Sequence, residues 1–392
     1  MKNNQDITQD IKKILFTLKK NIKKKNPLVH LHEPFMKGKE KQYISNCINT
    51  NSVSSIGSYS LKFQNEIKKI TKSKYVILTS SGTAALHLSL ICAGVKKNDE
   101  ILMPNLNYVA SANSALYCGA TPHLVDIRAE DLCIDSIKLE KYLKKILKVQ
   151  KNFSINKKTK NIVRGLVCLH TFGHAAEIDK ISKICKKFKI VLIEDAAESL
   201  GTFYKNRHVG NFGLMGILSF NGNKIITSGG GGAILTNNQR IAKLASHLSQ
   251  ISKKKHKYLY EYDGLGFNYR LPNINCALGY AQIKNIKKIL KKKKNLYLKY
   301  YRMFKDINSI RLFKEPKNSK SNYWLQTIIL QKPDLKIRNF ILQKTNDIKI
   351  STRPVWQLLD EIKYLGKTPK MNLDVSKKLE KQIINLPSSP NL

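Results

Sequence analysis

The chain lacks the features that would indicate a secreted, membrane-spanning or metal-binding protein. Its seven cysteines are scattered over 392 residues without a Cys-x-x-Cys pair, so we expect neither a disulfide framework nor a zinc site. No apolar run is long enough to span a bilayer, and the first residues lack the short apolar segment of a signal peptide. The sequence therefore predicts a cytoplasmic protein without a membrane span and without a bound metal.

Acidic residues are also scarce. The 27 Asp and Glu residues face 70 Lys and Arg residues, which leaves a formal net charge of +43. Such a charge often indicates nucleic acid or an anionic membrane as a partner. Here the lysines are spread along the whole chain and do not form a basic stripe with aromatic residues, so we expect no nucleic-acid partner. A basic surface would still favour a negatively charged substrate such as a nucleotide sugar.

Two nucleotide-binding fingerprints are missing as well. No Gly-x-Gly-x-x-Gly follows the first expected strand, and no Gly-x-x-x-x-Gly-Lys-Ser/Thr occurs anywhere in the chain. The four consecutive glycines at 229–232 have neither spacing. They suit close backbone approach and positive φ instead, which would hold a neighbouring side chain in a fixed loop.

From residue 75 onward, the sequence contains short apolar runs, several of them separated by helical patterns. Runs that are apolar at nearly every position are typical of strands covered on both faces, and strands interleaved with helices indicate a largely parallel sheet. Helical patterns at 83–93 and 177–188 follow the first and fourth of these runs. The sequence thus predicts an α/β fold with a mostly parallel, seven-stranded sheet, whose strands are expected at 75–79, 101–103, 122–127, 164–170, 189–194, 216–220 and 232–236.

Three segments are expected along the chain. Residues 1–30 would form an N-terminal extension with an amphipathic helix at 7–22, which lies on the body or on a partner subunit in preference to a membrane surface. Residues 31–274 would form the large domain. Residues 275–392 would form a smaller α+β domain, with a long helix at about 277–305 and strands at 323–330 and 348–353.

Lys224 is the most informative single residue. It ends the stretch Ser219-Phe-Asn-Gly-Asn-Lys224 and precedes the glycine run. A lysine amine becomes a covalent catalyst when it lies against an aldehyde, and pyridoxal phosphate (PLP) is the commonest biological source of one. Most lysines are simply exposed on the surface, so this assignment depends on the rest of the chain.

Two further motifs lie at expected strand ends. At the junction of the first strand and its helix, the free N–H groups of Ser81-Gly82-Thr83 and the Thr83 hydroxyl could bind a phosphate. An ordinary helix cap is the alternative. Asp195 follows the apolar run 190–193, where a carboxylate could keep the pyridine nitrogen of PLP protonated. The alternative for Asp195 is a capping or ion-paired acid.

Together these motifs resemble those of the PLP-dependent sugar-nucleotide aminotransferases of the DegT and StrS type. The resemblance covers nearly the whole chain from about residue 30 and implies a fold-type I PLP-dependent transferase. It rests on four motifs in the same order: Ser-Gly-Thr-Ala-Ala-Leu (81–86), Glu-Asp-Ala-Ala-Glu-Ser (194–199), Ser-Phe-Asn-Gly-Asn-Lys (219–224) and Gly-Phe-Asn-Tyr-Arg-Leu-Pro-Asn (266–273).

The resemblance implies a role for each matching residue at the cofactor ring. Lys224 would form the Schiff base with PLP, and Asp195 would pair with the pyridine nitrogen. Tyr108 would stack on the ring, while Glu198 would lie near the phenolic oxygen and the substrate. Because some relatives carry histidine in place of the lysine and are dehydratases, Lys224 favours an aminotransferase.

The resemblance also implies a phosphate site that two subunits share. Gly82, Thr83 and Ser219 would bind the phosphate from one subunit. Asn268 would complete the site from the neighbouring subunit, so the active unit would be a homodimer. A PLP-binding regulatory protein without catalytic activity is the alternative within the same fold.

Several segments look most similar to the branch that acts in legionaminic acid and bacillosamine-like pathways. That branch uses a UDP-linked 2-acetamido-4-keto-6-deoxy sugar, and the amino donor would be glutamate. One departure is Asn51-Ser52, where relatives often have Gly-Trp. A GDP- or TDP-linked 4-keto sugar is the alternative substrate. The similar segments are 31–34, 53–59, 170–174, 353–356 and 386–390.

Three residues of these segments are candidate substrate contacts. Arg353 and Trp356 would bind the diphosphate and the base or sugar of the nucleotide, and His174 would lie near the substrate. Structural roles are the alternative for all three: an ion-paired arginine, a tryptophan in the core and a packing histidine.

Overall fold

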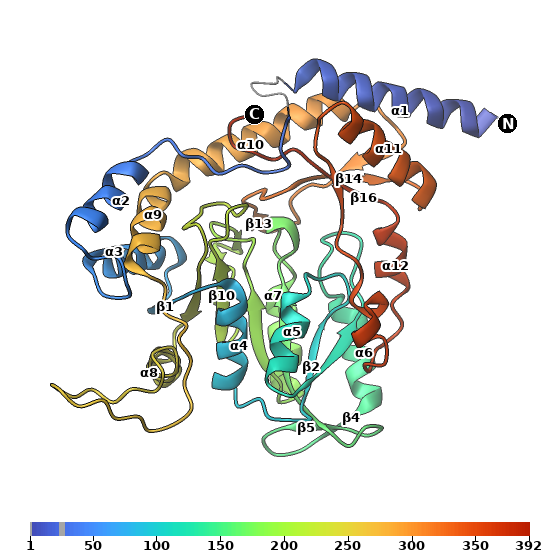
Figure 1. The fold of residues 1–392 in the computed structure, drawn as a ribbon. Helices are drawn as coiled ribbons and strands as arrows, with labels where there is room; N and C mark the ends of the chain where they lie inside the picture. Colours follow the sequence, from blue (N-terminus) through green and yellow to red (C-terminus); the bar gives the residue numbers. More distant parts are fainter. Residues whose placement is uncertain (1, 23–27) are drawn as a thin grey trace.

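The computed structural model describes residues 2–22 and 28–392, with side chains from Asp10 onward (Figure 1). The helices are α1 (Lys2–Asn21), α2 (Glu40–Asn49), α3 (Ser58–Thr71), α4 (Gly82–Cys92), α5 (Ala110–Tyr117), α6 (Ser136–Ile146), α7 (Ile178–Lys187), α8 (Gln239–Leu248), α9 (Asn273–Lys284), α10 (Ile286–Phe304), α11 (Leu335–Asp347), α12 (Asp374–Glu380) and the short 3₁₀ turns η1 (Thr171–Gly173), η2 (Leu359–Glu361) and η3 (Lys363–Leu365). The strands are β1 (Tyr75–Thr79), β2 (Glu100–Pro104), β3 (Thr121–Val125), β4 (Leu147–Val149), β5 (Ser154–Asn156), β6 (Ile162–Leu169), β7 (Val191–Asp195), β8 (Phe203–Tyr204), β9 (Arg207–His208), β10 (Met215–Ser219), β11 (Gly232–Thr236), β12 (Ile310–Leu312), β13 (Ser319–Lys320), β14 (Gln326–Leu330), β15 (Arg353–Pro354) and β16 (Ile383–Leu386).

A nine-stranded sheet forms the centre of the molecule (Figure 1). Its main path runs β1-β11-β10-β7-β6-β2-β3, and β4 and β5 extend it beside β6. The pairs from β10 to β3 are parallel, whereas β11 runs antiparallel to both β1 and β10. All seven predicted strands are therefore present, and the predicted mostly parallel sheet is confirmed.

Helices cover both faces of this sheet. Successive side chains of a buried strand point to opposite faces, so each strand packs against helices on both sides. In β2, Leu102 packs into the core cluster that includes residues of α3, α6 and α7. Its neighbours Ile101 and Met103 pack into the cluster formed with α4, α5 and α8. A sheet covered in this way leaves only the ends of its strands accessible, and ligands bind there in doubly wound folds.

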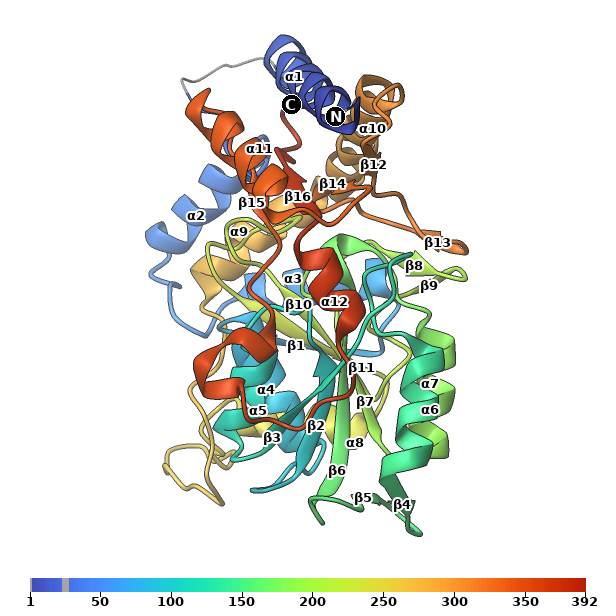
Figure 2. The same cartoon turned by 90° about the vertical axis from the view of Figure 1, so that its right-hand side faces the viewer.

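Residues 275–392 build a second, four-stranded sheet in the order β12-β14-β16-β15 (Figure 2). The prediction of a single long helix at 277–305 is wrong, because two helices, α9 and α10, meet at Asn285. Asparagine favours helix ends over helix interiors. Only 326–330 of the strand predicted at 323–330 forms, since Tyr323 has a left-handed φ of 52°. The strand predicted at 348–353 is reduced to Arg353–Pro354. The division of the chain near residue 275 remains a prediction.

The predicted N-terminal helix is present as α1, which lies across the end of the molecule beside α11 (Figures 1 and 2). Ile14, Leu18 and Ile22 are buried in a cluster with side chains of α10 and α11. Two parts of the prediction lie outside the residues described with side chains. They are Ile7, which belongs to the predicted helical pattern, and residues 23–27, near the predicted boundary at residue 30. Within the described ranges, no helix is both long and apolar enough to cross a membrane.

Candidate functional site

Three strand ends meet at one edge of the large sheet. Thr79 of β1 and Ser219 of β10 both pair with Gly232 of β11, so the loops after β1 and β10 lie on either side of this glycine. A Cβ atom at Gly232 would lie only 2.6 Å from the carbonyl oxygen of Ser81, which leaves no room for a side chain. The last glycine of the run therefore permits the close approach of two loops that carry predicted site residues.

The N-terminus of α4 forms one wall of the site. The Ser81 hydroxyl accepts a hydrogen bond from the backbone N–H of Ala84 at 3.0 Å and so caps the helix. The N–H groups of Gly82 and Thr83 belong to the first turn, which has no intrahelical acceptor for them. Gly82 lies against Ser219, since a Cβ on Gly82 would be 3.2 Å from the Ser219 hydroxyl. The predicted phosphate-binding residues are thus adjacent.

Lys224 is carried by a closed loop after β10. The backbone N–H of Lys224 donates to the Asn221 carbonyl at 3.0 Å, and Ser228 returns to the Phe220 carbonyl at 2.9 Å. The next residues, Ile225 and Ile226, are buried in the core and anchor the loop. The Lys224 side chain is 15 % exposed, and its Nζ lies 3.3 Å from Glu198 Oε1.

Asp195 ends β7, the strand next to β10. One of its carboxylate oxygens accepts the Ser111 hydroxyl at 3.0 Å, and the other accepts the Ala197 N–H at 3.1 Å. Burial raises the pKa of Asp195, while these hydrogen bonds and the charge of Lys224 lower it. The carboxyl is therefore held in a fixed orientation at the edge of the sheet.

Glu198 lies three residues after Asp195, in the turn that follows β7, and is 3 % exposed. Its second oxygen, Oε2, accepts the Phe172 N–H at 2.9 Å. Burial raises the pKa of Glu198 to about 7, against the opposing charge of Lys224. Glu198 can therefore change protonation near neutral pH, directly beside the lysine amine.

These residues line a pocket of about 310 Å³. Eight of the predicted site residues contribute to its lining: Lys224, Gly82, Thr83, Tyr108, Asp195, Glu198, Ser219 and Trp356. Tyr108 is 54 % exposed, and its ring centroid lies 6.2 Å from that of Trp356. A Cβ on Gly230, which also lines the pocket, would find only the Ser80 carbonyl within 4.0 Å. The pocket thus combines an amine, two carboxyls, a helix N-terminus and aromatic walls.

Arg353 and Asn268 do not line this pocket. Arg353 is exposed on β15, where it pairs with Asn385 of β16. Asn268 lines a larger hollow of about 1260 Å³ beside α8, together with Arg270 and several lysines. Within one chain the structure therefore leaves these two predicted residues apart from Lys224.

His174 is also not at the pocket. Its Nδ1 lies 2.8 Å from the Ser321 hydroxyl, and the rings of Phe313 and Tyr323 meet it edge-on at 4.7 and 5.5 Å. The side chain is 1 % exposed, and burial lowers its pKa to about 3, so the imidazole is neutral. This placement matches the packing role and not the substrate contact.

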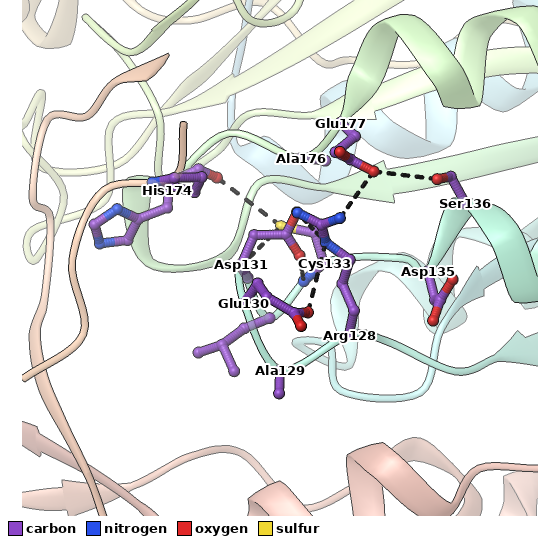
Figure 3. A network of polar contacts seen from close by, with 12 residues as sticks. Arg128, Ala129, Glu130, Asp131, Cys133, Asp135, Ser136, His174, Ala176 and Glu177 are labelled. Carbon is purple, nitrogen blue, oxygen red and sulfur yellow. Dashed lines mark hydrogen bonds and ion pairs between the residues drawn. The ribbon is translucent and has the colours of Figure 1, made fainter. Parts of the chain in front are cut away.

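The carbonyl of His174 borders a network of polar residues on the loop before α6 (Figure 3). Arg128 pairs with buried Asp131 at 2.9 Å and with Glu177 at 2.8 Å. The Cys133 thiol donates to the Asp131 carbonyl at 3.3 Å, and burial raises its pKa, which makes it unreactive. The network links this loop to α7. In the described part of the chain, no group of three or more His, Cys, Asp or Glu side chains is placed to hold a metal ion.

Two residues that contact predicted site residues were missed from the sequence, and one of them, Trp324, lines the pocket. Ser111 orients Asp195, and Trp324 lies beneath Lys224, with the amine 4.1 Å from the ring centroid. Trp324 is one of only two tryptophans in the chain, and the other, Trp356, lines the same pocket. The rarity of tryptophan was the one available signal for Trp324, whereas nothing in its surroundings distinguishes Ser111 from other serines.

Replacing Glu198 by glutamine is expected to change how the stability of the cofactor-free protein depends on pH. With a pKa of about 7 in the folded state and an ordinary value of 4.5, Glu198 retains a proton that the unfolded chain releases. This stabilisation is fully present below the ordinary value and is lost as the pH rises through about 7. Since Glu198→Gln cannot titrate, its Tm relative to wild type should rise from about pH 5 to about pH 7.

The matched control for this variant is Glu130→Gln, because the Glu130 side chain is 73 % exposed. Thermal unfolding of the three proteins across this pH range provides the measurement. A Tm difference between Glu198→Gln and wild type that stays constant with pH would show that Glu198 does not titrate as described.

The chain is similar to known proteins in sequence and in fold. The model of the DegT/DnrJ/EryC1/StrS aminotransferase family matches residues 34–392. The GDP-perosamine synthase of Escherichia coli O157:H7 is 32 % identical, over 93 % of this chain and 94 % of that protein. The UDP-4-amino-4,6-dideoxy-N-acetyl-beta-L-altrosamine transaminase of Campylobacter jejuni serotype O:23/36 is 31 % identical, over 79 % and 80 %. The structure of Helicobacter pylori PseC, an aminotransferase involved in the biosynthesis of pseudoaminic acid, has a TM-score of 0.84 at 25 % identity, over 93 % and 95 %.

Proposed function

We propose a reaction from two facts: the chain belongs to the DegT/DnrJ/EryC1/StrS aminotransferase family, and Lys224, Asp195 and Glu198 line one pocket. The reaction is the transfer of an amino group from glutamate to the C4 ketone of a nucleotide-linked 4-keto-6-deoxy sugar. Its cofactor is PLP. The substrate is UDP-2-acetamido-2,6-dideoxy-hexos-4-ulose, as in the legionaminic acid and bacillosamine-like pathways, and the enzyme works in the cytoplasm.

The residues of the pocket fit PLP. The N–H groups at the start of α4, next to Ser219, offer donors for a phosphate, and the positive end of the helix dipole favours an anion there. Asp195 offers a fixed carboxylate for a protonated ring nitrogen. Tyr108 offers an aromatic face, and Lys224 offers the amine. When bound, PLP supplies an aldehyde and a ring that accepts electrons released at carbon.

The chain's own residues then divide the work of proton transfer. Lys224 Nζ would move the proton from the Cα atom of glutamate to the cofactor and, in the second half of the reaction, would move a proton from the cofactor to C4 of the sugar. Glu198 Oε1, 3.3 Å away, would stabilise the amine while it carries a proton in each half. The aromatic rings of Tyr108, Trp324 and Trp356 exclude water from the amine. The single observation that carries the proposal is the pairing of Lys224 with Glu198 in the same pocket as Asp195.

A GDP-linked 4-keto sugar is the second candidate substrate. It is favoured by the GDP-perosamine synthases of Escherichia coli O157:H7 and Vibrio cholerae, which match over 93 % of this chain, compared with 79 % for the UDP-altrosamine transaminase of Campylobacter jejuni. Incubation with glutamate and a panel of UDP-, GDP- and TDP-linked 4-keto sugars, followed by mass spectrometry and NMR of the products, tests the proposal. A protein that binds PLP but gives no half-reaction with glutamate would instead be a regulatory protein of the same fold.

The proposed active unit is a homodimer with shared sites. Residues 250–268 extend from the body and turn back on themselves, with bridges between Gln250 and Asn268 and between Lys253 and Tyr262 (Figure 1). This arm exposes large apolar side chains that a partner subunit would cover: Ile251, Tyr258, Leu259, Tyr260, Tyr262 and Leu265. Asn268 lies at the base of the arm, which supports its proposed role at the site of the partner.

The replacement Leu265→Asp is expected to dissociate the dimer. Leu265 is 84 % exposed within one chain, and a buried unpaired carboxylate would strongly disfavour the interface. Analytical ultracentrifugation should show a shift toward monomer, together with weaker PLP binding. Ile137→Asp is the control, because Ile137 is 64 % exposed on α6, away from the arm. Wild-type sedimentation of Leu265→Asp would contradict the role of the arm.

A further inference from the structure

The segment between β13 and β14 comes from the C-terminal part of the chain but reaches the pocket in the large sheet. The side-chain amide of Asn322 donates to the carbonyls of Glu198 at 2.8 Å and of Leu200 at 3.0 Å. The Asn322 N–H donates to the Thr202 hydroxyl at 3.1 Å. The segment is therefore fixed to the backbone that carries Glu198.

Trp324 continues this segment and makes two contacts with the lysine loop. Its indole N–H donates to the carbonyl of Asn223, the residue just before Lys224, at 2.6 Å. The Lys224 amine lies over the indole ring, 4.1 Å from its centroid. One side chain thus holds both the backbone next to the lysine and the lysine amine itself.

The backbone of Trp324 is held in turn by buried groups. Its N–H donates to the Asn322 side-chain oxygen at 2.9 Å, and its carbonyl accepts the Lys293 amine at 2.6 Å. Lys293 is fully buried on α10, and its amine also donates to the Ser388 carbonyl. Burial lowers the pKa of Lys293 well below its ordinary value and so favours the neutral amine, which can donate the bonds to Trp324 and Ser388 without an unpaired buried charge.

These contacts restrict the lysine amine to one place. The negative face of an indole ring attracts an ammonium group, and Glu198 Oε1 lies 3.3 Å from the same amine. An amine that is held between a ring and a carboxylate loses less rotational freedom when it reacts. We propose that Trp324 is a positioning residue for Lys224: its indole N–H fixes the backbone before the lysine, and its ring holds the amine beside Glu198.

This inference rests on the proposed function, in which Lys224 is the reactive lysine, and its first test needs no cofactor. Trp324→Leu removes both contacts, whereas Trp324→Phe keeps a ring and removes the N–H donor. In cofactor-free protein, acylation of Lys224 by a small reagent, followed by mass spectrometry, should be about two- to fivefold faster in Trp324→Leu. Trp324→Phe should lie between this variant and wild type. Equal labelling rates in all three proteins overturn the inference.

The matched control for labelling is Leu86→Ala, because Leu86 lines the same pocket and has no role in binding or catalysis. Its Lys224 should be acylated at the wild-type rate. If Leu86→Ala accelerates labelling as much as Trp324→Leu does, the effect is one of pocket opening, and the specific role of Trp324 is wrong.

The half-reaction with glutamate gives the second readout. Its maximal rate should fall about tenfold or more in Trp324→Leu, while half-saturation by glutamate changes less than about twofold, because the base is displaced and donor binding is not. Partial recovery in Trp324→Phe would support the ring contact, and a wild-type rate in Trp324→Leu would overturn the inference. A wild-type protein that forms no covalent bond with PLP would overturn the proposed function itself.

Discussion

The Lys224→Ala protein is expected to lose the visible absorbance of covalently bound PLP and to lose turnover by about 10³-fold or more. The estimate is a lower bound, since proton transfer by one positioned side chain alone contributes about 10²–10⁴-fold. The same amine is proposed to bind the cofactor and to move both protons. No other lysine lines the pocket in the described part of the chain. Absorbance spectra and product formation with glutamate and the preferred keto sugar provide the measurement.

Lys205→Ala is the matched control for this experiment. Lys205 pairs with Asp179 at 2.6 Å and is 52 % exposed, so its removal should leave absorbance and turnover unchanged. Exposed ion pairs of this kind contribute little to stability. Full turnover in Lys224→Ala would refute the assignment of the catalytic lysine, and a similar loss in Lys205→Ala would show that charge, and not position, is responsible.

The strands of the large sheet could be predicted because a strand that is buried on both faces appears in the sequence as a continuous apolar run. A strand such as β2 packs Ile101 and Met103 on one side and Leu102 on the other, so every position must be apolar. The polar motifs directly follow these apolar runs in the sequence, so they lie where the strands end. The meeting of Gly82, Ser219 and Asp195 was therefore predictable from strand order and from the motifs of the resembling family.

The C-terminal part was harder to predict because its turns depend on long-range contacts. Tyr323 and Trp324 have the aromatic character of strand residues, yet Asn322 holds this segment to the carbonyls of Glu198 and Leu200. The left-handed φ of Tyr323 then turns the chain before β14 begins. Contacts across more than 100 residues thus decide a local conformation, and the contact of Trp324 with Lys224 depends on them.

The misplacement of His174 has a similar cause. The histidine follows β6, so the sequence placed it near the sheet edge that carries the site. In the structure, the turn Thr171–Gly173 contains Phe172 with a left-handed φ of 55°. This turn directs the Phe172 N–H to Glu198 and sends the imidazole of His174 to Ser321 instead. A backbone conformation that is rare for phenylalanine could not be inferred from residue types alone.

Replacing Asp195 by asparagine is expected to separate cofactor binding from catalysis. Asparagine has nearly the same shape: its side-chain oxygen can accept the Ala197 N–H, and its amide can donate to the Ser111 hydroxyl oxygen, which lies 3.0 Å from the carboxylate. The variant should therefore retain the visible absorbance that Lys224→Ala loses. Without the negative charge, the ring nitrogen is no longer kept protonated, and electrons released at carbon are accepted less readily. The maximal rate with glutamate should fall on the order of 10²–10³-fold.

Asp179→Asn is the matched control, because Asp179 on α7 pairs with Lys205 and lies outside the pocket. Stopped-flow measurement of the half-reaction with glutamate distinguishes the variants. Burial raises the pKa of Asp195, and a positively charged partner such as the protonated ring would oppose this shift, together with Ser111 and Ala197. An Asp195→Asn protein with the wild-type rate would show that this carboxylate serves only to fix the end of β7, and the assignment of the ring nitrogen to Asp195 would be wrong.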